Sequence, residues 1–244
     1  MGEHGHGGSL GPCRQPRMLE AMQVDAVIVA AGGSTRFGET DKLAATLVGR
    51  PVLAWSLAAY GGAHSVGALV VVAPMEKHDW VREMAAQWAP VKDVLLVLGG
   101  ERRRDSVEAG LRACRSRYVA IHDGARPLTP ADLIQRVIAA AEGTNGAIAA
   151  MPVTDTIKEV QAHTVYGHPE RSSLWAAQTP QVVLRQAWLD AAKMSDNDET
   201  DDAAMLSRLG LECRVVESSA ENIKITRPLD LEIAAMILRS RGLT

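Results

Sequence analysis

The chain has 244 residues, of which 47% are hydrophobic, and a formal net charge of −3. This length is sufficient for one large α/β domain or for two small ones. The negative charge argues against a protein that mainly coats nucleic acid, so any cations that matter for function must be clustered. Because no linker-like composition interrupts the chain after residue 24, we predict one domain over residues 24–244.

The first 23 residues contain five glycines, two histidines and no apolar run. They match neither a signal peptide nor a membrane span, and we expect a disordered tail over residues 1–23. Cys13, Cys114 and Cys213 are odd in number and far apart. They indicate neither a disulfide framework nor a zinc site, and we predict no protein metal site, no membrane association and a reducing cytoplasm as location.

Apolar runs and amphipathic segments alternate along most of the chain. They predict strands at 25–29, 68–72, 94–98, 118–122 and 147–151, and helices at 52–60, 76–88, 104–114 and 130–142. This βαβ alternation predicts a doubly wound, mostly parallel sheet. Since ligands bind beyond the carboxyl ends of strands in such sheets, the loops after residues 30, 98 and 122 should line one common binding site.

The pattern changes between residues 154 and 178. Residues 156–160 and 174–178 are predicted to pair as a protruding two-stranded arm. Such an arm is marginally stable alone, so we expect it to pack on a partner chain in a homodimer. Further helices are predicted at 184–194, 199–209 and 228–239, with a strand at 212–216 and an extended segment at 223–226.

The first predicted strand runs directly into a loop that combines small residues with two cations. Ala30, Ala31 and Gly32 would let a ligand approach the backbone closely. Arg36 and Lys42 flank that gap, and a phosphate chain lying on backbone N–H groups would need such charges. An ordinary loop with solvated charges explains this stretch alone equally well.

Two later strand ends carry further polar clusters. Residues 99–107 open a helix whose unpaired N–H groups favour a carbonyl or phosphate acceptor. Within them, Arg102 and Arg104 are expected to be solvated. Asp123 and Arg126 suit hydroxyl and phosphate groups, although an ion pair between them would explain the same residues.

Four further features have a less distinctive pattern. His122 is expected to be a packed residue rather than a catalyst. Arg171 in the arm and Lys224 are the other candidate cations, and alternation turns Lys224 away from the isoleucines on either side. The acidic run at 196–202 lacks the glycine and terminal glutamate of a calcium loop, so helix capping is its expected use.

Seven blocks of the chain resemble, in order and over nearly all of residues 25–240, the 2-C-methyl-D-erythritol 4-phosphate cytidylyltransferases of the non-mevalonate isoprenoid pathway. They are Ala30-Ala-Gly32 with Arg36 and Lys42, Gly99-Gly100 with Arg103 and Ser106-Val107, residues 122–127, Asp155-Thr-Ile-Lys158, Gln178-Thr-Pro-Gln181, Thr200-Asp-Asp-Ala203 and Asn222-Ile-Lys224. One block would be a weak signal, whereas seven in sequence are specific.

The resemblance implies a Rossmann-like nucleotidyltransferase that transfers CMP from CTP to a sugar-alcohol phosphate. The acceptor's phosphate would attack the α-phosphorus of CTP in line and release pyrophosphate. By the same resemblance Arg36, Lys42 and Lys224 hold the triphosphate, with Mg2+ bridging its oxygens. Arg171 completes the expected catalytic set.

The resemblance also assigns the remaining candidates. The residues expected at the nucleotide are Ala30, Ala31, Gly32, Gly100, Glu101 and Ser106. Thr156 and Arg171, delivered by the arm of a neighbouring subunit, would hold the acceptor's phosphate. Asp123, Arg126 and Thr200 are expected on the substrate as well.

The departures from the family pattern are concentrated in the opening loop. Ser34 replaces the usual second glycine and Phe37 the usual methionine. Thr40-Asp41 replaces Cys/Val-Pro, with one residue fewer than usual between Arg36 and Lys42. These features are closer to the molybdenum-cofactor nucleotidylyltransferases, and the family pattern does not fix how far Lys42 reaches.

Three alternatives stay open at this stage. A cytidylyltransferase for another sugar-alcohol phosphate, such as ribitol 5-phosphate, resembles the family at most of the same blocks. A molybdopterin nucleotidylyltransferase is favoured only by the first loop and opposed by residues 178–181 and 222–224. A regulator that binds nucleotide without turnover ranks low because the chain retains every expected cation.

Overall fold

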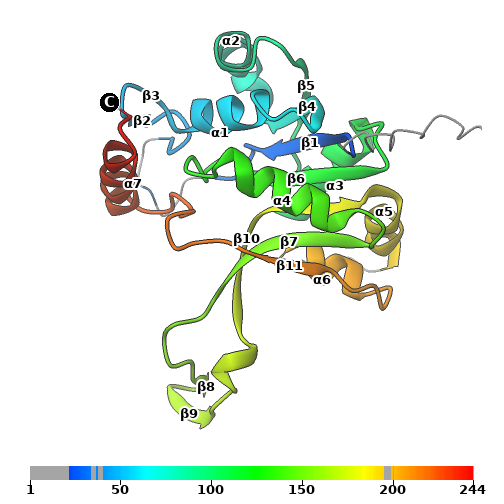
Figure 1. Ribbon diagram of the computed structural model, residues 1–244, viewed down its shortest axis with the longest axis vertical. Coiled ribbons are helices and arrows are strands. Elements are labelled where there is room, and N and C mark those ends of the chain that lie inside the picture. Colours follow the sequence, from blue (N-terminus) through cyan, green and yellow to red (C-terminus); the bar gives the residue numbers. More distant parts are fainter. Residues whose placement is uncertain (1–21, 34–36, 38–40, 195–198, 200, 244) are drawn as a thin grey trace, which may run out of the picture.

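The structure is a computed structural model that describes residues 22–33, 37, 41–194, 199 and 201–243. Residues 1–21 of the predicted tail, Arg36 and Thr200 therefore lie outside the described residues. Figure 1 shows a central sheet covered by helices, and a slender arm that extends away from it. None of the described helices is long and apolar enough to cross a membrane.

The central sheet contains seven strands in the order β11-β7-β10-β6-β1-β4-β5. Their bounds are β1 Val24–Val29, β4 Val66–Ala73, β5 Asp93–Leu98, β6 Tyr118–Asp123, β7 Gly146–Pro152, β10 Trp175–Leu184 and β11 Arg214–Glu217. Strand β10 is antiparallel to both of its neighbours, β6 and β7, and the other pairs are parallel. The predicted α/β fold with a mostly parallel sheet is confirmed.

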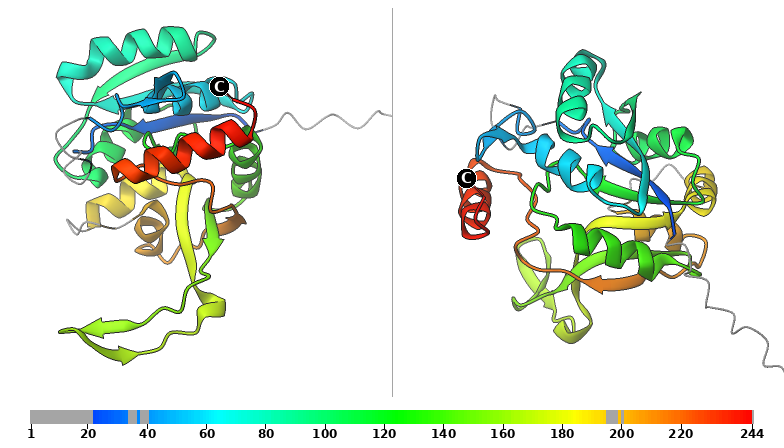
Figure 2. Two further views of the ribbon diagram at one scale, coloured as in Figure 1. Left: turned by 90° about the vertical axis from the view of Figure 1, so that its left-hand side faces the viewer. Right: turned by 45° about the horizontal axis from the view of Figure 1, so that its top comes forward.

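Apart from the C-terminal helix, which lies to one side, the helices form two layers, one on each face of the sheet (Figures 1 and 2). Their bounds are α1 Val52–Gly61, α2 His78–Trp88, α3 Arg103–Ala113, α4 Ala131–Ala141, α5 Arg185–Met194, α6 Asp202–Ser207 and α7 Pro228–Ser240, with short 3-10 turns η1 Met75–Lys77 and η2 Arg171–Ser173. Buried side chains of α1, α2, α4 and α7 join one hydrophobic core, and those of α3, α5 and α6 join the other.

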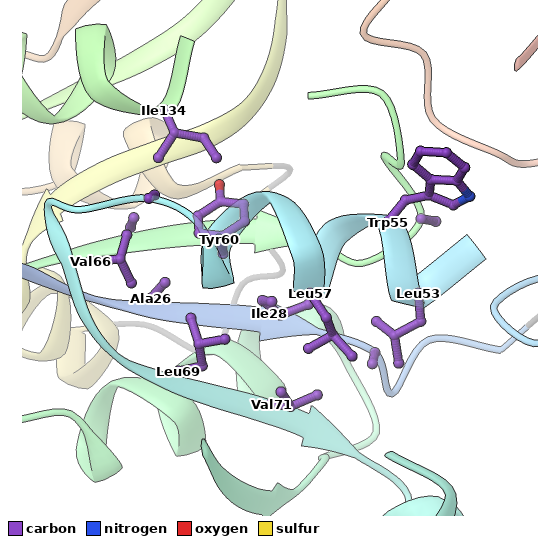
Figure 3. Packing of buried hydrophobic residues seen from close by; sticks show 14 of the residues in the cluster. Ala26, Ile28, Leu53, Trp55, Leu57, Tyr60, Val66, Leu69, Val71 and Ile134 are labelled. Atoms are coloured by element: carbon purple, nitrogen blue, oxygen red, sulfur yellow. The ribbon is translucent and has the colours of Figure 1, made fainter. Parts of the chain in front are cut away.

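Strand β1 belongs to both cores because its side chains alternate between the two faces. Ala26 and Ile28 face the α1 side, whereas Val27 faces α3, and all three are fully buried. In Figure 3, Leu57 and Tyr60 of α1 lie over β1 and β4. Burial on both faces explains the continuous apolar run that predicted this strand.

A small hairpin connects the opening loop to α1. It pairs β2 (Thr46–Leu47) with β3 (Arg50–Pro51). The guanidinium of Arg50 lies between two indole rings, 4.0 Å from the centre of Trp55 and 4.3 Å from that of Trp88. Trp55 also donates its indole N–H to the carbonyl of Leu47 at 2.9 Å. These contacts fix the hairpin on α1 and α2.

The arm protrudes at the predicted place, but the predicted pairing within it is wrong. Residues 156–160 do not pair with 174–178. Instead, β8 (Glu159–Gln161) pairs with β9 (Thr164–Gly167) at the tip, and β10 continues into the central sheet. Val182 and Val183 of β10 are fully buried, so burial between β6 and β7 determines where this segment pairs.

Candidate active site

The loops after β1, β5 and β6 meet at one edge of the sheet, together with the segment that precedes α7. They enclose a first cavity of about 200 Å³, lined by Val29, Ala31, Gly32, Gly33, Lys42, Leu43, Gly100, Glu101, Arg102, Arg103, Ser106, Asp123, Ala125 and Lys224. A second cavity lies beside it and is lined by Arg103, Asp123, Arg126, Ala177, Gln178, Thr179, Gln181, Asp201 and Lys224. The two cavities therefore share Arg103, Asp123 and Lys224.

Close packing of backbone forms one side of the first cavity. A Cβ atom at Gly99 would lie 2.2 Å from that of Ala31, and one at Gly100 would lie 2.5 Å from that of Asp105. Gly99 therefore lets the loop after β5 approach the loop after β1, and Gly100 lets the same loop approach the start of α3. Ala30, predicted to contact nucleotide, is buried and does not line the cavity.

The start of α3 contributes polar groups to the same cavity. Ser106 accepts a hydrogen bond at its Oγ from the backbone N–H of Gly100, at 3.1 Å. The Asp105 carboxylate caps the helix by accepting from the backbone and side chain of Arg102. These hydrogen bonds lower the pKa of Asp105. The first turn of α3 is therefore held by hydrogen bonds from within the chain.

The expectation that Arg104 is solvated is wrong. Its side chain is buried and donates to the backbone carbonyl of Ala192 at the end of α5. The contact arises because α3 packs against α5, although the two helices are far apart in the sequence. Arg102 is partly exposed and pairs with Asp105.

Asp123 is the carboxylate at the centre of the site. Its Oδ1 accepts from Arg103 Nε at 3.2 Å, and its Oδ2 accepts from Lys224 Nζ at 2.8 Å. Arg126 Nε lies 3.9 Å from Oδ2. Burial alone would raise the pKa of Asp123, but Arg103, Lys224 and Arg126 more than offset it, and the pKa lies well below the ordinary range. Asp123 is therefore ionised at neutral pH.

Arg103 connects this carboxylate to helix α6. Its Nη2 donates to Asp202 Oδ2 at 2.8 Å, and Asp202 is only 1% exposed. Trp188 donates its indole N–H to the other Asp202 oxygen at 3.1 Å. Burial opposes the charge of Arg103, but the carboxylates of Asp202 and Asp123 raise its pKa further above its usual value. Arg103 is thus a permanent cation held in one position by two carboxylates.

The segment that carries Lys224 is held by a buried amide network. Asn222 donates through Nδ2 to Gln178 Oε1 at 2.9 Å and to the Thr179 carbonyl at 3.0 Å. Ile225 is fully buried, and its N–H donates to the carbonyl of Ala125 at 2.8 Å. As predicted from alternation, Lys224 points away from this buried neighbour, toward Asp123.

His122 is packed, as predicted. It is fully buried, with its Nδ1 3.0 Å from Thr179 Oγ1 and its Nε2 3.2 Å from the Arg126 carbonyl. Burial lowers its pKa to about 3, although the neighbouring Asp123 opposes that shift. The imidazole is therefore neutral at pH 7 and holds the loop after β6 in place.

A family model described as 2-C-methyl-D-erythritol 4-phosphate cytidylyltransferase matches residues 24–240. The chain belongs to this family. It is therefore a nucleotidyltransferase by membership, and the family predicted from the seven sequence blocks is confirmed.

Individual relatives agree with the family match. The protein of that name from Prochlorococcus marinus (strain MIT 9313) is 42% identical over 88% of this chain and 98% of its own length. The one from Synechococcus elongatus is 40% identical over 89% and 97%. The crystal structure of the Thermus thermophilus cytidylyltransferase superposes with a TM-score of 0.72 at 28% identity, covering 89% of this chain and all of that chain.

The fold is shared more widely still. The crystal structure of the 4-diphosphocytidyl-2C-methyl-D-erythritol synthase from Anaerococcus prevotii superposes with a TM-score of 0.80 at 24% identity, over 90% of this chain and all of that chain. At this identity the likeness concerns the fold alone.

Apart from the buried Ala30, the predicted site residues of this family member fall into three groups. The first cavity brings together Ala31, Gly32, Lys42, Gly100, Glu101, Ser106, Asp123 and Lys224, and the second adds Arg126. Thr156 and Arg171 line a separate open cavity on the arm, where Arg171 donates to the Thr154 carbonyl at 3.0 Å. Arg36 and Thr200 lie outside the described residues.

Sequence reasoning gave no role to several residues that the structure places in the site. Arg103 and Gln181 were recognised only as members of family blocks. Gln181 accepts through Oε1 from the backbone N–H groups of Asp202 and Ala203, and so fixes the start of α6. Their positions within the blocks were the available signal, but their partners lie 20 or more residues away in the chain.

Proposed function

We propose that this chain transfers CMP from CTP to 2-C-methyl-D-erythritol 4-phosphate, giving 4-diphosphocytidyl-2-C-methyl-D-erythritol and pyrophosphate. The observation that carries the proposal is that family-block residues from four separate segments line one cavity at the strand ends. This is where parallel α/β sheets bind their ligands. Relatives that bear this name align over nearly their whole length.

In the proposed complex the nucleotide occupies the first cavity. Its triphosphate lies over the backbone of Ala31 and Gly32, between Lys42 and Lys224. Arg36 belongs to the same group by its place in the family block. The cytidine lies toward Gly100, Glu101 and Ser106, which line the cavity before α3 and in its first turn.

The acceptor's phosphate is the nucleophile and attacks the α-phosphorus in line. It is already an anion near neutral pH, so no side-chain base is required. The protein's task is to align two anions and to stabilise the charge that develops on the transferring phosphorus. Arg103, Arg126 and Lys224 outnumber the carboxylates of Asp123 and Asp202 by one charge, and Lys42 is a further cation at the first cavity.

Mg2+ is part of the proposal and would be held mainly by the phosphate oxygens. Among the described residues no group of three His, Cys, Asp or Glu side chains gathers where a metal ion could be held. Asp123 lines both cavities, and Mg2+ is commonly bound through one or two carboxylates together with substrate phosphates and water. Both oxygens of Asp123 already accept from Arg103 and Lys224, so phosphate and water oxygens would supply most of the ligands of such an ion. When bound, it neutralises phosphate charge.

The acceptor side of the proposal requires a second copy of the chain. Thr156 and Arg171 of a neighbouring subunit bind the acceptor's phosphate, while Asp123 and Arg126 bind its hydroxyls. Thr200 belongs to the substrate residues by its place in the family block. The arm at 154–178 supports a homodimer because it displays apolar side chains to solvent. These are Ile157, Val160, Val165, Tyr166 and Trp175, between 38% and 66% exposed. The single domain at 24–244 and a cytoplasmic location belong to the same proposal.

The test is a pyrophosphate-release assay with purified protein, Mg2+, CTP and a panel of acceptors. We expect turnover with 2-C-methyl-D-erythritol 4-phosphate and little with ribitol 5-phosphate. Lys42→Ala serves as the low-activity control. Faster turnover with ribitol 5-phosphate would reassign the acceptor, and tight CTP binding without product over hours would point to a regulator instead.

A further inference from the structure

Lys42 lies at the point where the sequence departs most from the family, directly after Thr40-Asp41. The structure gives Asp41 a specific local role. Its Oδ1 accepts from the backbone N–H of Leu43 at 3.1 Å, and its carbonyl accepts from those of Ala44 and Ala45 at 3.1 and 3.0 Å. Asp41 therefore closes the tight turn that carries Lys42.

The second carboxylate oxygen of Asp41 is bound from another part of the fold. Lys77 Nζ lies 2.8 Å from Asp41 Oδ2, and the two side chains are 30% and 23% exposed. Lys77 ends η1, the turn that directly follows β4, and β4 pairs with β1 in the centre of the sheet. The ion pair thus connects the turn that carries Lys42 to η1. Through η1 and β4, this turn is linked to β1, the strand that precedes the opening loop.

On its other side, Lys42 is followed by residues anchored on α1. Leu43 is buried, and its carbonyl accepts from Leu53 N–H at 3.1 Å. The carbonyl of Ala45 accepts from Val52 N–H at 3.0 Å. The backbone after Lys42 is therefore fixed by α1, whereas the residue before it is fixed through a side-chain charge.

We propose that Asp41 and Lys77 are a positioning pair that holds Lys42 at the wall of the first cavity, directed at the polyphosphate of a nucleotide. The inference rests on the proposed function for the identity of that ligand. Lysine has a long, flexible side chain, so the direction of its backbone decides how often the ammonium reaches a given phosphate. A half-buried ion pair that sets this direction affects binding although it touches no substrate.

The experiment combines steady-state kinetics with direct titration of CTP. Lys77→Met should lower kcat/KM for CTP roughly tenfold, because a small misplacement of a binding group is costly. It should weaken CTP binding in the titration and leave KM for the acceptor unchanged. Asp41→Asn keeps an oxygen for the turn but loses the charge, so it should reproduce the effect. Lys77→Arg should stay within about twofold of the wild type, because it keeps the charge.

The decisive arm of the experiment is the double variant. In a Lys42→Ala background, Lys77→Met should cause no further loss, because the pair acts only through Lys42. Lys193→Met removes an exposed pair with Asp190 on α5 and should change nothing. Additive losses, a changed acceptor KM, or wild-type CTP affinity in a folded Lys77→Met protein would overturn the proposal. The CTP titration still tests the pair if the wild type transfers no CMP to the acceptor, so the two failures are distinguishable.

Discussion

The sheet-end site and the arm carry the two halves of the predicted chemistry, and they are built in opposite ways. Asp123 is 8% exposed and meets cations from three segments of the chain within 4 Å. On the arm, Arg171 is exposed and donates to a backbone carbonyl nearby. The contacts proposed for the nucleotide are thus assembled and charge-compensated within one chain, whereas those proposed for the acceptor's phosphate are displayed on a hairpin without a core of its own.

Among changes at the sheet-end site, the loss of Lys224 should reduce activity most. We expect Lys224→Ala to lower kcat by roughly two to three orders of magnitude, because the ammonium stabilises charge that grows during the reaction. Single-turnover and steady-state kinetics measure this, with Lys193→Ala as a matched exposed lysine. An increase in KM with unchanged kcat would mean that Lys224 only anchors substrate.

The folding stability of the sheet-end site should depend on Arg103. Arg103→Met leaves Asp202 buried without its guanidinium partner, and we expect the free energy of unfolding to fall by about 3 kcal/mol. Denaturant titration provides the measurement. Arg112→Met, which breaks an exposed pair with Glu108 on the same helix, should cost at most ~1 kcal/mol. Equal losses for the two variants would show that burial of the Asp202 pair is unimportant.

Mixing two inactive variants tests whether one active site combines the sheet-end residues of one subunit with the arm of the other. Arg171→Ala and Lys42→Ala proteins, mixed in equal amounts and allowed to exchange, should recover about a quarter of wild-type activity, because half the dimers would contain one intact site. Pyrophosphate release before and after mixing is the readout, and each variant alone is the control. No recovery despite exchange would argue for sites completed within one chain.

The smallest expected effect is a dependence of folding stability on pH that arises from residues of the sheet-end site. His122 has a pKa of about 3 in the folded protein, below its ordinary value, so the unfolded chain takes up the proton first as the pH falls. Stability should fall by about 1 kcal/mol between pH 7 and pH 5.5 from this residue. Asp123, whose folded pKa is depressed, loses its contribution only below about pH 4.

Urea unfolding at several pH values, compared with His122→Gln, isolates this effect. The amide can replace hydrogen bonds of the imidazole but does not titrate. The slope of stability against pH between 7 and 5.5 should therefore be shallower in the variant. Parallel slopes for the two proteins would contradict a neutral, buried His122.

Much of the sheet-end half was predictable because it follows local rules. Val27 to Val29 end a buried strand before a loop of small residues, and such strand ends converge in a parallel sheet. Partners distant in the sequence were not predictable. Nothing local distinguishes the buried Arg104 from its neighbours, and the pairing of β10 with β7 and β6 depends on a register that only the folded sheet determines.

The register of β7 and β10 has a consequence for how the arm relates to the rest of the molecule. Pro152 lies opposite Trp175, and Val153 donates its N–H to the Leu174 carbonyl at 3.0 Å, so both ends of the arm leave the sheet side by side. The arm is topologically an enlarged hairpin loop. It can lengthen or shorten without altering the order of the strands. Under the proposed function, acceptor preference is therefore free to diverge while the nucleotide-binding frame stays the same.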